Sequence, residues 1–344
     1  MNALTPETPE GPGTPHSPVR RLITISIPVY NEEGNIARLL ERLNAFAASE
    51  AERFDFEFLF TDNASEDRTY ELLAEAGKTD PRIRILRFSR NFGFQRSVLT
   101  NFINARGDAA VQLDADLQDP PELISEFIKH WDKGYKVVYG IRRVRKESWL
   151  LNKARRRYYR LVRSLSEVPV PKDAGDFRLI DRVVIDHLKT IEDQAPYVRG
   201  IIASLGYPQV GVRYERDVRK AGKSKFGLSK LIFLGVDGIT SQSTKPLSYI
   251  TLFGFAMCGL TVLVGLAYLA LFLTNRSNLT PGFTTLVLML LFSIGMNALM
   301  IGMVGEYVGR IFNNVRGHPF TIVERDFEQG REALAVFSAV DGVR

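Results

Sequence analysis

Apolar and polar positions alternate in blocks over the first part of the chain. Five apolar, β-branched runs predict buried strands at residues 22–30, 56–61, 83–88, 109–113 and 137–141. Between them, apolar residues recur at helical spacing and predict helices at about 36–46, 69–76, 95–105 and 120–133. Strands that alternate with helices are typical of β-α-β units. The pattern predicts an α/β domain with a mostly parallel sheet over residues 21–227.

The second part of the chain has a different pattern, with two long apolar runs. Residues 247–273 and 283–305 contain no charged side chain. Each run is at least as long as the ~20 residues that cross a bilayer core as a helix. We therefore expect transmembrane helices at 246–275 and 281–306, forming a two-helix hairpin after the α/β domain.

Two basic or apolar segments before this hairpin favour contact with a membrane surface. Residues 147–166 predict a basic amphipathic helix within the α/β domain, and residues 228–245 predict a juxtamembrane interface helix. Ten Lys or Arg between Arg142 and Arg163 could bind anionic lipid or nucleic acid, and the apolar runs favour lipid. An ordinary solvated face remains the alternative for the basic helix.

Charge and composition predict the placement of the chain. The net charge is +6, and basic residues flank the two apolar runs on their outer sides, whereas the loop between them holds only Arg276. This bias predicts a multi-pass protein of the cytoplasmic (inner) membrane with the α/β domain and both termini in the cytoplasm. Residues 1–20 predict a disordered tail without a signal peptide, and residues 307–344 predict a cytoplasmic C-terminal tail. The single cysteine, Cys258, excludes a disulfide within the chain and a cysteine metal site.

Acidic residues follow the predicted strands. Glu32, Asp62, Asp114 and Asp116 stand at or just past strand ends, which meet at one edge of a parallel sheet where ligands bind. Asp114 and Asp116 are carboxylate ligands of the kind that Mg²⁺ or Mn²⁺ prefers, and Gln118 could add a carbonyl oxygen. Polar strand ends that simply meet solvent remain the alternative.

The chain has no glycine-rich phosphate loop of the common types, so a metal and cations must meet phosphate charge. Arg142 ends the fifth strand, and Arg219 and Lys225 lie in a loop with Gly and Ser. A divalent metal on a nucleotide sugar would stabilise the departing nucleoside diphosphate. If the acceptor is a lipid monophosphate, its second pKa is near ~6, so it is largely dianionic and a strong general base is less necessary than for a sugar hydroxyl.

Six motifs in order give the chain a family resemblance over about residues 22–312. They are Ile27–Glu33, Asp62–Asp67, Ser89–Gly93, Asp114–Pro121, Gly175–Leu179 and Arg219–Lys225. The chain resembles family 2 glycosyltransferases of the GT-A fold, and within them the polyprenyl-phosphate glycosyltransferases related to dolichol-phosphate mannose synthase. The two C-terminal spans are similar to the bacterial branch, which includes bactoprenol glucosyltransferases and undecaprenyl-phosphate formamido-arabinose transferases.

The resemblance implies roles for matching positions. Asp114, Asp116 and Gln118 would hold Mg²⁺ or Mn²⁺. Nucleotide-sugar binding would fall to Pro28, Tyr30, Glu32, Phe60, Asp62, Ala115, Arg142, Arg219 and Lys225, although Phe60 stands where the family usually has an aliphatic residue. Asp116 would act in catalysis, and Asp176 matches the aspartate proposed as a base. A dianionic acceptor favours an orienting role for Asp176, and a structural role, either a bond to Arg178 or a helix start, is the alternative.

The resemblance also implies a reaction. It is an inverting, metal-dependent transfer of glucose or a modified pentose, UDP-linked, to undecaprenyl or another polyprenyl phosphate at the membrane. Some members of the family are homotetramers, so a homo-oligomer is an expectation from the resemblance alone. A processive polysaccharide synthase is one alternative, against which stand only two predicted spans and no Gln-x-x-Arg-Trp motif. A non-enzymatic scaffold that binds nucleotide sugars is the other, and the intact Asp114 and Asp116 pair argues against it.

Overall fold

The computed structural model describes residues 20–142, 174–191, 193–215, 282–316 and 319–338, together with parts of 247–266. Several expectations lie outside this part of the chain. They are most of the N-terminal tail, the amphipathic helix at 147–166, the interface helix at 228–245, and the loop that contains Arg219 and Lys225.

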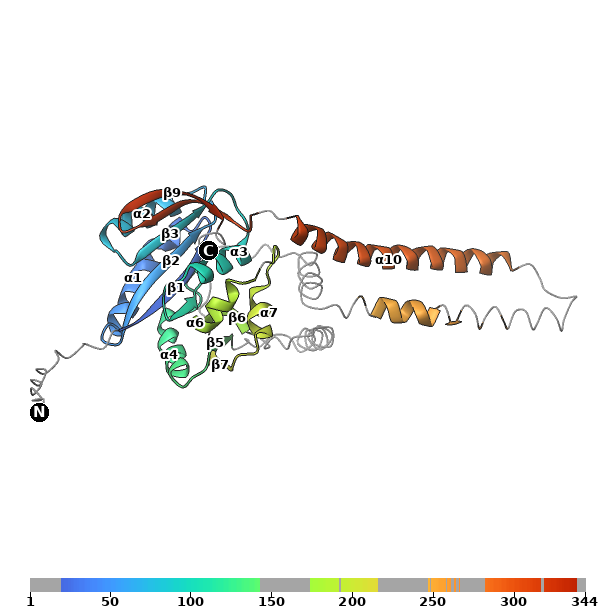
Figure 1. Ribbon diagram of the computed structural model, residues 1–344, viewed down its shortest axis with the longest axis horizontal. Coiled ribbons are helices and arrows are strands. Elements are labelled where there is room, and N and C mark those ends of the chain that lie inside the picture. The colour runs from blue at the N-terminus through green and yellow to red at the C-terminus, as the bar shows by residue number, and fades with distance from the viewer. Residues whose placement is uncertain are drawn as a thin grey trace, which may run out of the picture.

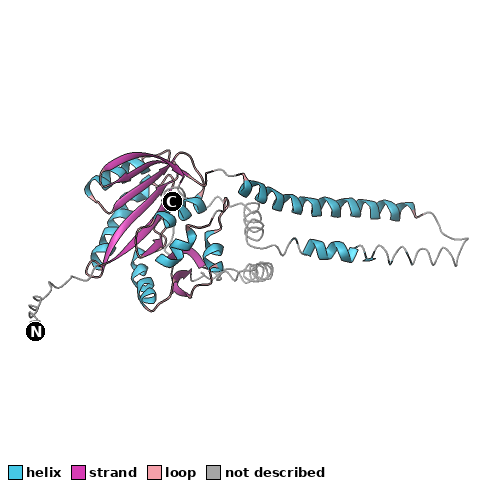
Figure 2. Cartoon of the chain, in the orientation of Figure 1, coloured by secondary structure: helices cyan, strands magenta, loops and turns pink. Residues whose placement is uncertain are grey.

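The described residues form a nine-stranded sheet in the order β7-β5-β6-β4-β1-β2-β3-β8-β9 (Figure 2). The strands are β1 (Arg21–Val29), β2 (Phe54–Asp62), β3 (Ile83–Phe88), β4 (Ala109–Gln112), β5 (Val137–Arg142), β6 (Ala174–Asp181), β7 (Gln209–Tyr214), β8 (Ile322–Glu328) and β9 (Arg331–Ser338). The four central strands are parallel, and only β6 and β8 of the described strands run opposite to β1. The predicted α/β fold with a mostly parallel sheet is confirmed.

Helices cover both faces of this sheet (Figure 1). The side chains of Ile25 and Phe58 lie on one face of the sheet, which is covered by α1 (Glu33–Ser49), α2 (Thr69–Thr79) and α4 (Ile124–Asp132). The short 3-10 helix η1 (Pro121–Leu123) directly precedes α4. The other face is covered by α3 (Phe94–Asn104), α6 (Arg182–Leu188) and α7 (Val198–Ser204). Successive strand residues point to opposite faces, so the nearly continuous apolar strands fill both cores.

The C-terminal region differs from the predicted tail. The helix α10 (Phe283–Val315) continues past the predicted end of the second apolar run, and β8 and β9 then form a hairpin that pairs with β3. Arg84 on β3 makes an ion pair of 2.8 Å with Asp326 on β8, and the Tyr70 hydroxyl donates to Glu332 on β9. The strands that follow α10, β8 and β9, are therefore part of the α/β domain.

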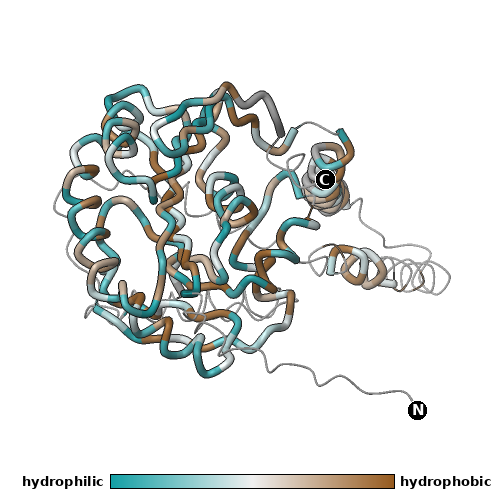
Figure 3. Tube along the Cα trace, turned by 60° about the vertical axis from the view of Figure 1, so that its left-hand side comes forward, coloured by the Kyte–Doolittle hydropathy of each residue, from teal (hydrophilic) through white to brown (hydrophobic). Residues whose placement is uncertain are grey.

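The helical residues 249–257 and α10 lie between β7 and β8 in the sequence, and both extend away from the α/β domain (Figure 1). Many large apolar side chains on both segments are exposed, among them Leu252, Phe255, Leu286 and Ile311, and Figure 3 shows apolar residues along the projecting parts. None of the helices in the described ranges reaches the combination of length and apolar character expected of a membrane span. The predicted transmembrane hairpin is thus not shown.

Candidate active site

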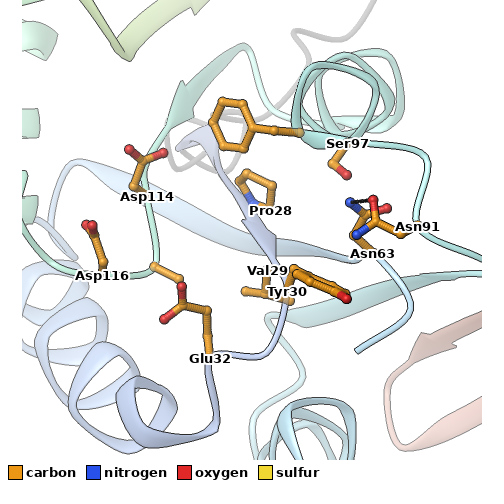
Figure 4. Close-up of a pocket in the computed structure, with 11 residues that line it drawn as sticks. Pro28, Val29, Tyr30, Glu32, Asn63, Asn91, Ser97, Asp114 and Asp116 are labelled. Carbon is orange, nitrogen blue, oxygen red and sulfur yellow. Dashed lines mark hydrogen bonds between the residues drawn. The ribbon is translucent and has the colours of Figure 1, made fainter. Parts of the chain in front are cut away.

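A pocket of about 320 Å³ opens where the central parallel strands end (Figure 4). Residues after β1, β2, β3 and β4 contribute to it because these strands point the same way and end at the same edge of the sheet. The lining residues are Pro28, Val29, Tyr30, Glu32, Asn63, Asn91, Phe94, Ser97, Asp114, Ala115 and Asp116.

The pocket has two chemically different ends. Asp114, Asp116 and Glu32 lie at one end, Asn63, Asn91 and Ser97 lie at the other, and the end of β1 runs between them (Figure 4). Among the residues expected to bind a nucleotide sugar or metal, the structure brings together Pro28, Tyr30, Glu32, Asp114, Ala115 and Asp116. The acidic strand ends are thus neighbours in space.

Sequence reasoning missed the amide end of the pocket. The side-chain amide of Asn63 donates to the Asn91 carbonyl oxygen over 2.9 Å, and the Phe92 backbone N–H donates to Asn63 over 2.8 Å. The Asn63 backbone N–H also donates to the Val29 carbonyl, so this contact joins the ends of β1, β2 and β3. The same strand-end position that singled out the acids could have singled out Asn63, which directly follows β2.

Phe60 and Asp62 are not among the pocket-lining residues. Phe60 is fully buried among the core residues beneath α1 and α2, so the expectation that it lines the nucleotide pocket is wrong. Asp62 is also fully buried and accepts a hydrogen bond of 3.0 Å from the Ser65 backbone N–H. Burial raises the pKa of Asp62, although Arg87 lies 3.6 Å away and opposes the shift. Within the described residues Asp62 Oδ2 has no hydrogen-bond partner, and its nucleotide contact stays a prediction.

Asp114 and Asp116 stand on a tight turn after β4. The Leu113 backbone N–H donates to the Ser26 carbonyl and anchors the turn to β1, and Leu117 adopts a positive φ of 55°. Asp116 accepts a hydrogen bond of 3.2 Å from the Gln118 backbone N–H. Gln118 itself is buried and is not among the lining residues, so its predicted metal contact stays a prediction.

The electrostatics of this turn suit a cation. Burial, then the negative charges of Asp176, Asp119 and Asp116, raise the pKa of Asp114 to about 7, and Arg142 opposes this shift. In the described part of the chain, no three His, Cys, Asp or Glu side chains are grouped to hold a metal ion by themselves. Asp114 and Asp116 would therefore supply two oxygens to a divalent cation, which would take its other ligands from substrate and water, as Mg²⁺ commonly does.

Arg142 is held beside this turn by a buried network. Its guanidinium donates to Asp119 and to the Tyr214 hydroxyl, each over 3.2 Å. The Tyr214 hydroxyl in turn donates to Asp119 Oδ1 over 2.5 Å, and Asp119 is fully buried. The network joins the end of β5 to the end of β7 and to the segment after the acidic turn. It therefore fixes the positively charged guanidinium of Arg142 next to Asp114.

Asp176 lies on β6 and is paired with an arginine that sequence reasoning did not single out. Arg199 Nε and Nη2 donate to the two carboxylate oxygens of Asp176, each over 2.6 Å. Arg199, Arg178 and Arg142 hold the pKa of Asp176 below its usual range despite burial. Arg178 donates to the Gly175 carbonyl over 3.0 Å, and burial lowers its own pKa to about 10. Arg199 thus holds the carboxylate, whereas the sequence offered a bond to Arg178 only as an alternative to an orienting role.

Known proteins resemble the chain over most of its length. It is 41% identical to an uncharacterized glycosyltransferase, YkcC, of Bacillus subtilis, over 88% of this chain and 94% of that protein. It is 32% identical to the SfII prophage-derived bactoprenol glucosyl transferase of Shigella flexneri, over 88% of this chain and 97% of that protein.

A solved structure, that of the mannosyltransferase PcManGT from Pyrobaculum calidifontis in complex with GDP-Man and Mn²⁺, is 16% identical, with a TM-score of 0.47 over 87% of this chain and 88% of that one. The model of glycosyl transferase family 2 matches residues 24–189, which run from within β1 to beyond β6 and include the acidic turn and Asp176. The expected family is confirmed: this chain belongs to glycosyl transferase family 2 and is a glycosyltransferase.

Proposed function

We propose that this enzyme transfers glucose from UDP-glucose to undecaprenyl phosphate at the cytoplasmic face of the inner membrane. The observation that carries the proposal is the acidic turn of Asp114 and Asp116 at one end of a strand-end pocket. Similarity to bactoprenol glucosyl transferases over nearly their whole length supports glucose and a polyprenyl phosphate as the substrates.

The pocket supports one orientation of the donor. The amide end, with Asn63 and Asn91, suits the hydrogen-bonding edges of a nucleobase, and the acidic end suits a metal-bound diphosphate. Tyr30 and Phe94 are each 41% exposed and line the pocket, so they offer aromatic surface for stacking. The sugar would then lie near the acidic turn and Asp176.

The transfer itself is a displacement at the anomeric carbon. An oxygen of the acceptor phosphate attacks C1 from the face opposite the diphosphate, the bond from C1 to the diphosphate oxygen breaks, and UDP leaves with inversion at C1. A divalent metal held by Asp114 and Asp116 would neutralise charge on the leaving diphosphate. Arg142, fixed by Asp119 and Tyr214, would add positive charge beside the same group. The acceptor dianion has little proton to lose, so positioning supplies most of the rate.

Membrane placement is part of the proposal. The uncharged runs 247–273 and 283–305 have the length of membrane spans, and exposed apolar side chains on the described parts of both runs favour a lipid environment. The basic residues between Arg142 and Arg163 would lie against anionic headgroups. A lipid acceptor could then meet a soluble donor at the membrane surface.

The test is direct. The purified full chain is incubated with a panel of radiolabelled nucleotide sugars and with undecaprenyl phosphate, with Mn²⁺ or Mg²⁺, and the lipid is extracted into organic solvent. We expect label from UDP-glucose in the organic phase, lost with a chelator and in Asp116→Asn. Asp186→Asn is the matched control because Asp186 is exposed on α6, and it should keep full activity. Transfer that survives metal chelation would overturn the metal role, and label from another donor alone would overturn UDP-glucose.

A further inference from the structure

The paired side chains of Asp176 and Arg199 form a second charged unit next to the acidic turn. Arg199 uses two nitrogens on the two carboxylate oxygens of Asp176, at 2.6 Å each. The Asp176 side chain is only 15% exposed and the Arg199 side chain 30% exposed. β6 runs antiparallel to β4 with Arg178 opposite Gln112, so Asp176, two residues before Arg178, lies level with Asp114, two residues after Gln112. The pair and the acidic turn are therefore neighbours at the same edge of the sheet.

We propose that Arg199 is a positioning residue for glycosyl transfer, which acts by holding the Asp176 carboxylate in one orientation beside Asp114 and Asp116. The inference rests on the proposed function in so far as Asp176 serves the transfer reaction. A two-bond guanidinium–carboxylate contact fixes both the rotamer and the plane of the carboxylate, which a single hydrogen bond does not do. The lone pairs that remain on Asp176 can then accept a hydrogen bond from a sugar hydroxyl in a set direction.

The position of Arg199 is itself fixed from the pocket side. Arg199 lies in the first turn of α7, where the Val198 backbone N–H donates to the Gln95 side chain over 3.1 Å. Just before α7, the Gln194 carbonyl accepts two hydrogen bonds from Arg96, of 2.6 and 3.1 Å. Gln95 and Arg96 both belong to the first turn of α3, the helix that carries Phe94 and Ser97 into the pocket.

The same junction reaches the end of α10. The Gln194 backbone N–H donates to the Asn314 side chain over 3.2 Å, and Arg96 also donates to the Phe320 carbonyl over 2.9 Å. The start of α7 is therefore held between α3, which lines the pocket, and the end of α10 with the residues that follow it. This arrangement gives Arg199 a rigid base from which to orient Asp176.

Steady-state kinetics on the full chain test the inference. We expect Arg199→Ala to lower kcat by about 10²-fold while the KM for the nucleotide sugar changes by less than about threefold, because a misplaced group costs rate more than donor binding. Arg199→Lys keeps the charge but cannot make the two-bond contact, so it should recover only part of the rate. A kcat of Arg199→Ala within about twofold of wild type would overturn the inference.

A double-mutant cycle separates positioning from a general structural role. If Arg199 acts through Asp176, then adding Arg199→Ala to Asp176→Asn should lower kcat by less than about threefold further. Losses that multiply would mean that Arg199 acts independently, and the inference would be wrong. If Arg199→Ala does not fold, the same cycle with Arg199→Lys gives the decision.

Arg84 offers a matched control because its guanidinium makes a similar two-bond contact with Asp326 between β3 and β8. Arg84→Ala should lower the melting temperature without changing kcat, and equal kcat losses in both arginine variants would refute the positioning role. All rates are measured as nucleoside diphosphate release with whichever acceptor the wild type uses. A wild type that uses another acceptor would correct the proposed function and leave the test of Arg199 intact.

Discussion

The charge on Asp114 should make the metal-free protein less stable as pH rises. Its surroundings raise the pKa of this carboxyl from 3.8 to about 7 in the folded state. Between these two values the folded protein holds a proton that the unfolded chain has lost, so stability falls across this window and the full penalty applies above it. At about 1.36 kcal/mol for each pH unit between the two pKa values, the ceiling is about 4 kcal/mol.

Asp114→Asn removes this penalty, and it also removes a metal ligand. We therefore expect the metal-free variant to melt above metal-free wild type at about pH 8 and to approach it at about pH 5, where the wild-type group is largely protonated. Relaxation around a charge leaves roughly half the ceiling, and about 2 kcal/mol corresponds to a melting temperature about 4–8 °C higher for a domain of this size. Mn²⁺ should stabilise the wild type most at high pH and stabilise Asp114→Asn little.

The assay is thermal unfolding of the full chain followed by intrinsic fluorescence, at both pH values, with chelator or with Mn²⁺. Asp186→Asn again serves as the control, because an exposed carboxylate should change the melting temperature little at either pH. A variant that melts at or below wild type at about pH 8 without metal would refute the electrostatic reasoning. Equal stabilisation of both proteins by Mn²⁺ would show that Asp114 does not bind the metal.

Substitutions at three further positions test other parts of the structure. Phe60→Ala should cost about 3–5 kcal/mol in denaturant unfolding because Phe60 fills the core, whereas Phe60→Leu should leave the donor KM within about twofold; a large KM increase would return Phe60 to the pocket. Tyr214→Phe removes the hydroxyl that links Asp119 to Arg142, and kcat should fall about tenfold; an unchanged kcat would show that the hydrogen bonds which hold Arg142 do not matter for the reaction. Arg96→Gln should increase hydrogen exchange at residues 193–198 and lower kcat less than Arg199→Ala does, and unchanged exchange would contradict the role of Arg96 as an anchor.

The first five strands could be predicted because their signal is local. Each is a short and mostly apolar run, and the third was placed at its observed bounds, Ile83–Phe88, although it contains Arg84 and Arg87. No strand was predicted for β6, β7, β8 or β9, and charged residues interrupt the apolar positions in β6 and at four of the seven positions of β8. Arg178 on β6 is buried, and Asp326 on β8 pairs with Arg84. Such strands are stabilised by partners far away in the chain, which a pattern of apolar positions does not contain.

The site shows the same division between local and long-range information. The acids after β1 and β4 were found because strand ends meet at one edge, a rule that needs only the order of the strands. Arg199 has no such signal, since only the packing of α7 brings it to Asp176. Phe60 was placed in the pocket by resemblance, but it lies on the strand face that packs against α1 and α2, and the alternation of side chains along β2 sends it into the core.

The pairing of β3 with β8 constrains how any membrane segment of this chain is arranged. Arg84 on β3 lies opposite Glu328 on β8 in an antiparallel register, so the chain before residue 215 and the chain after residue 321 belong to one sheet. A segment between them that enters a bilayer must return to the side it left, which requires an even number of crossings. A single span would place β8 across the membrane from β3 and break this register. The proposed pair of spans satisfies the constraint, and it sets the pocket and both ends of the hairpin on the same membrane face.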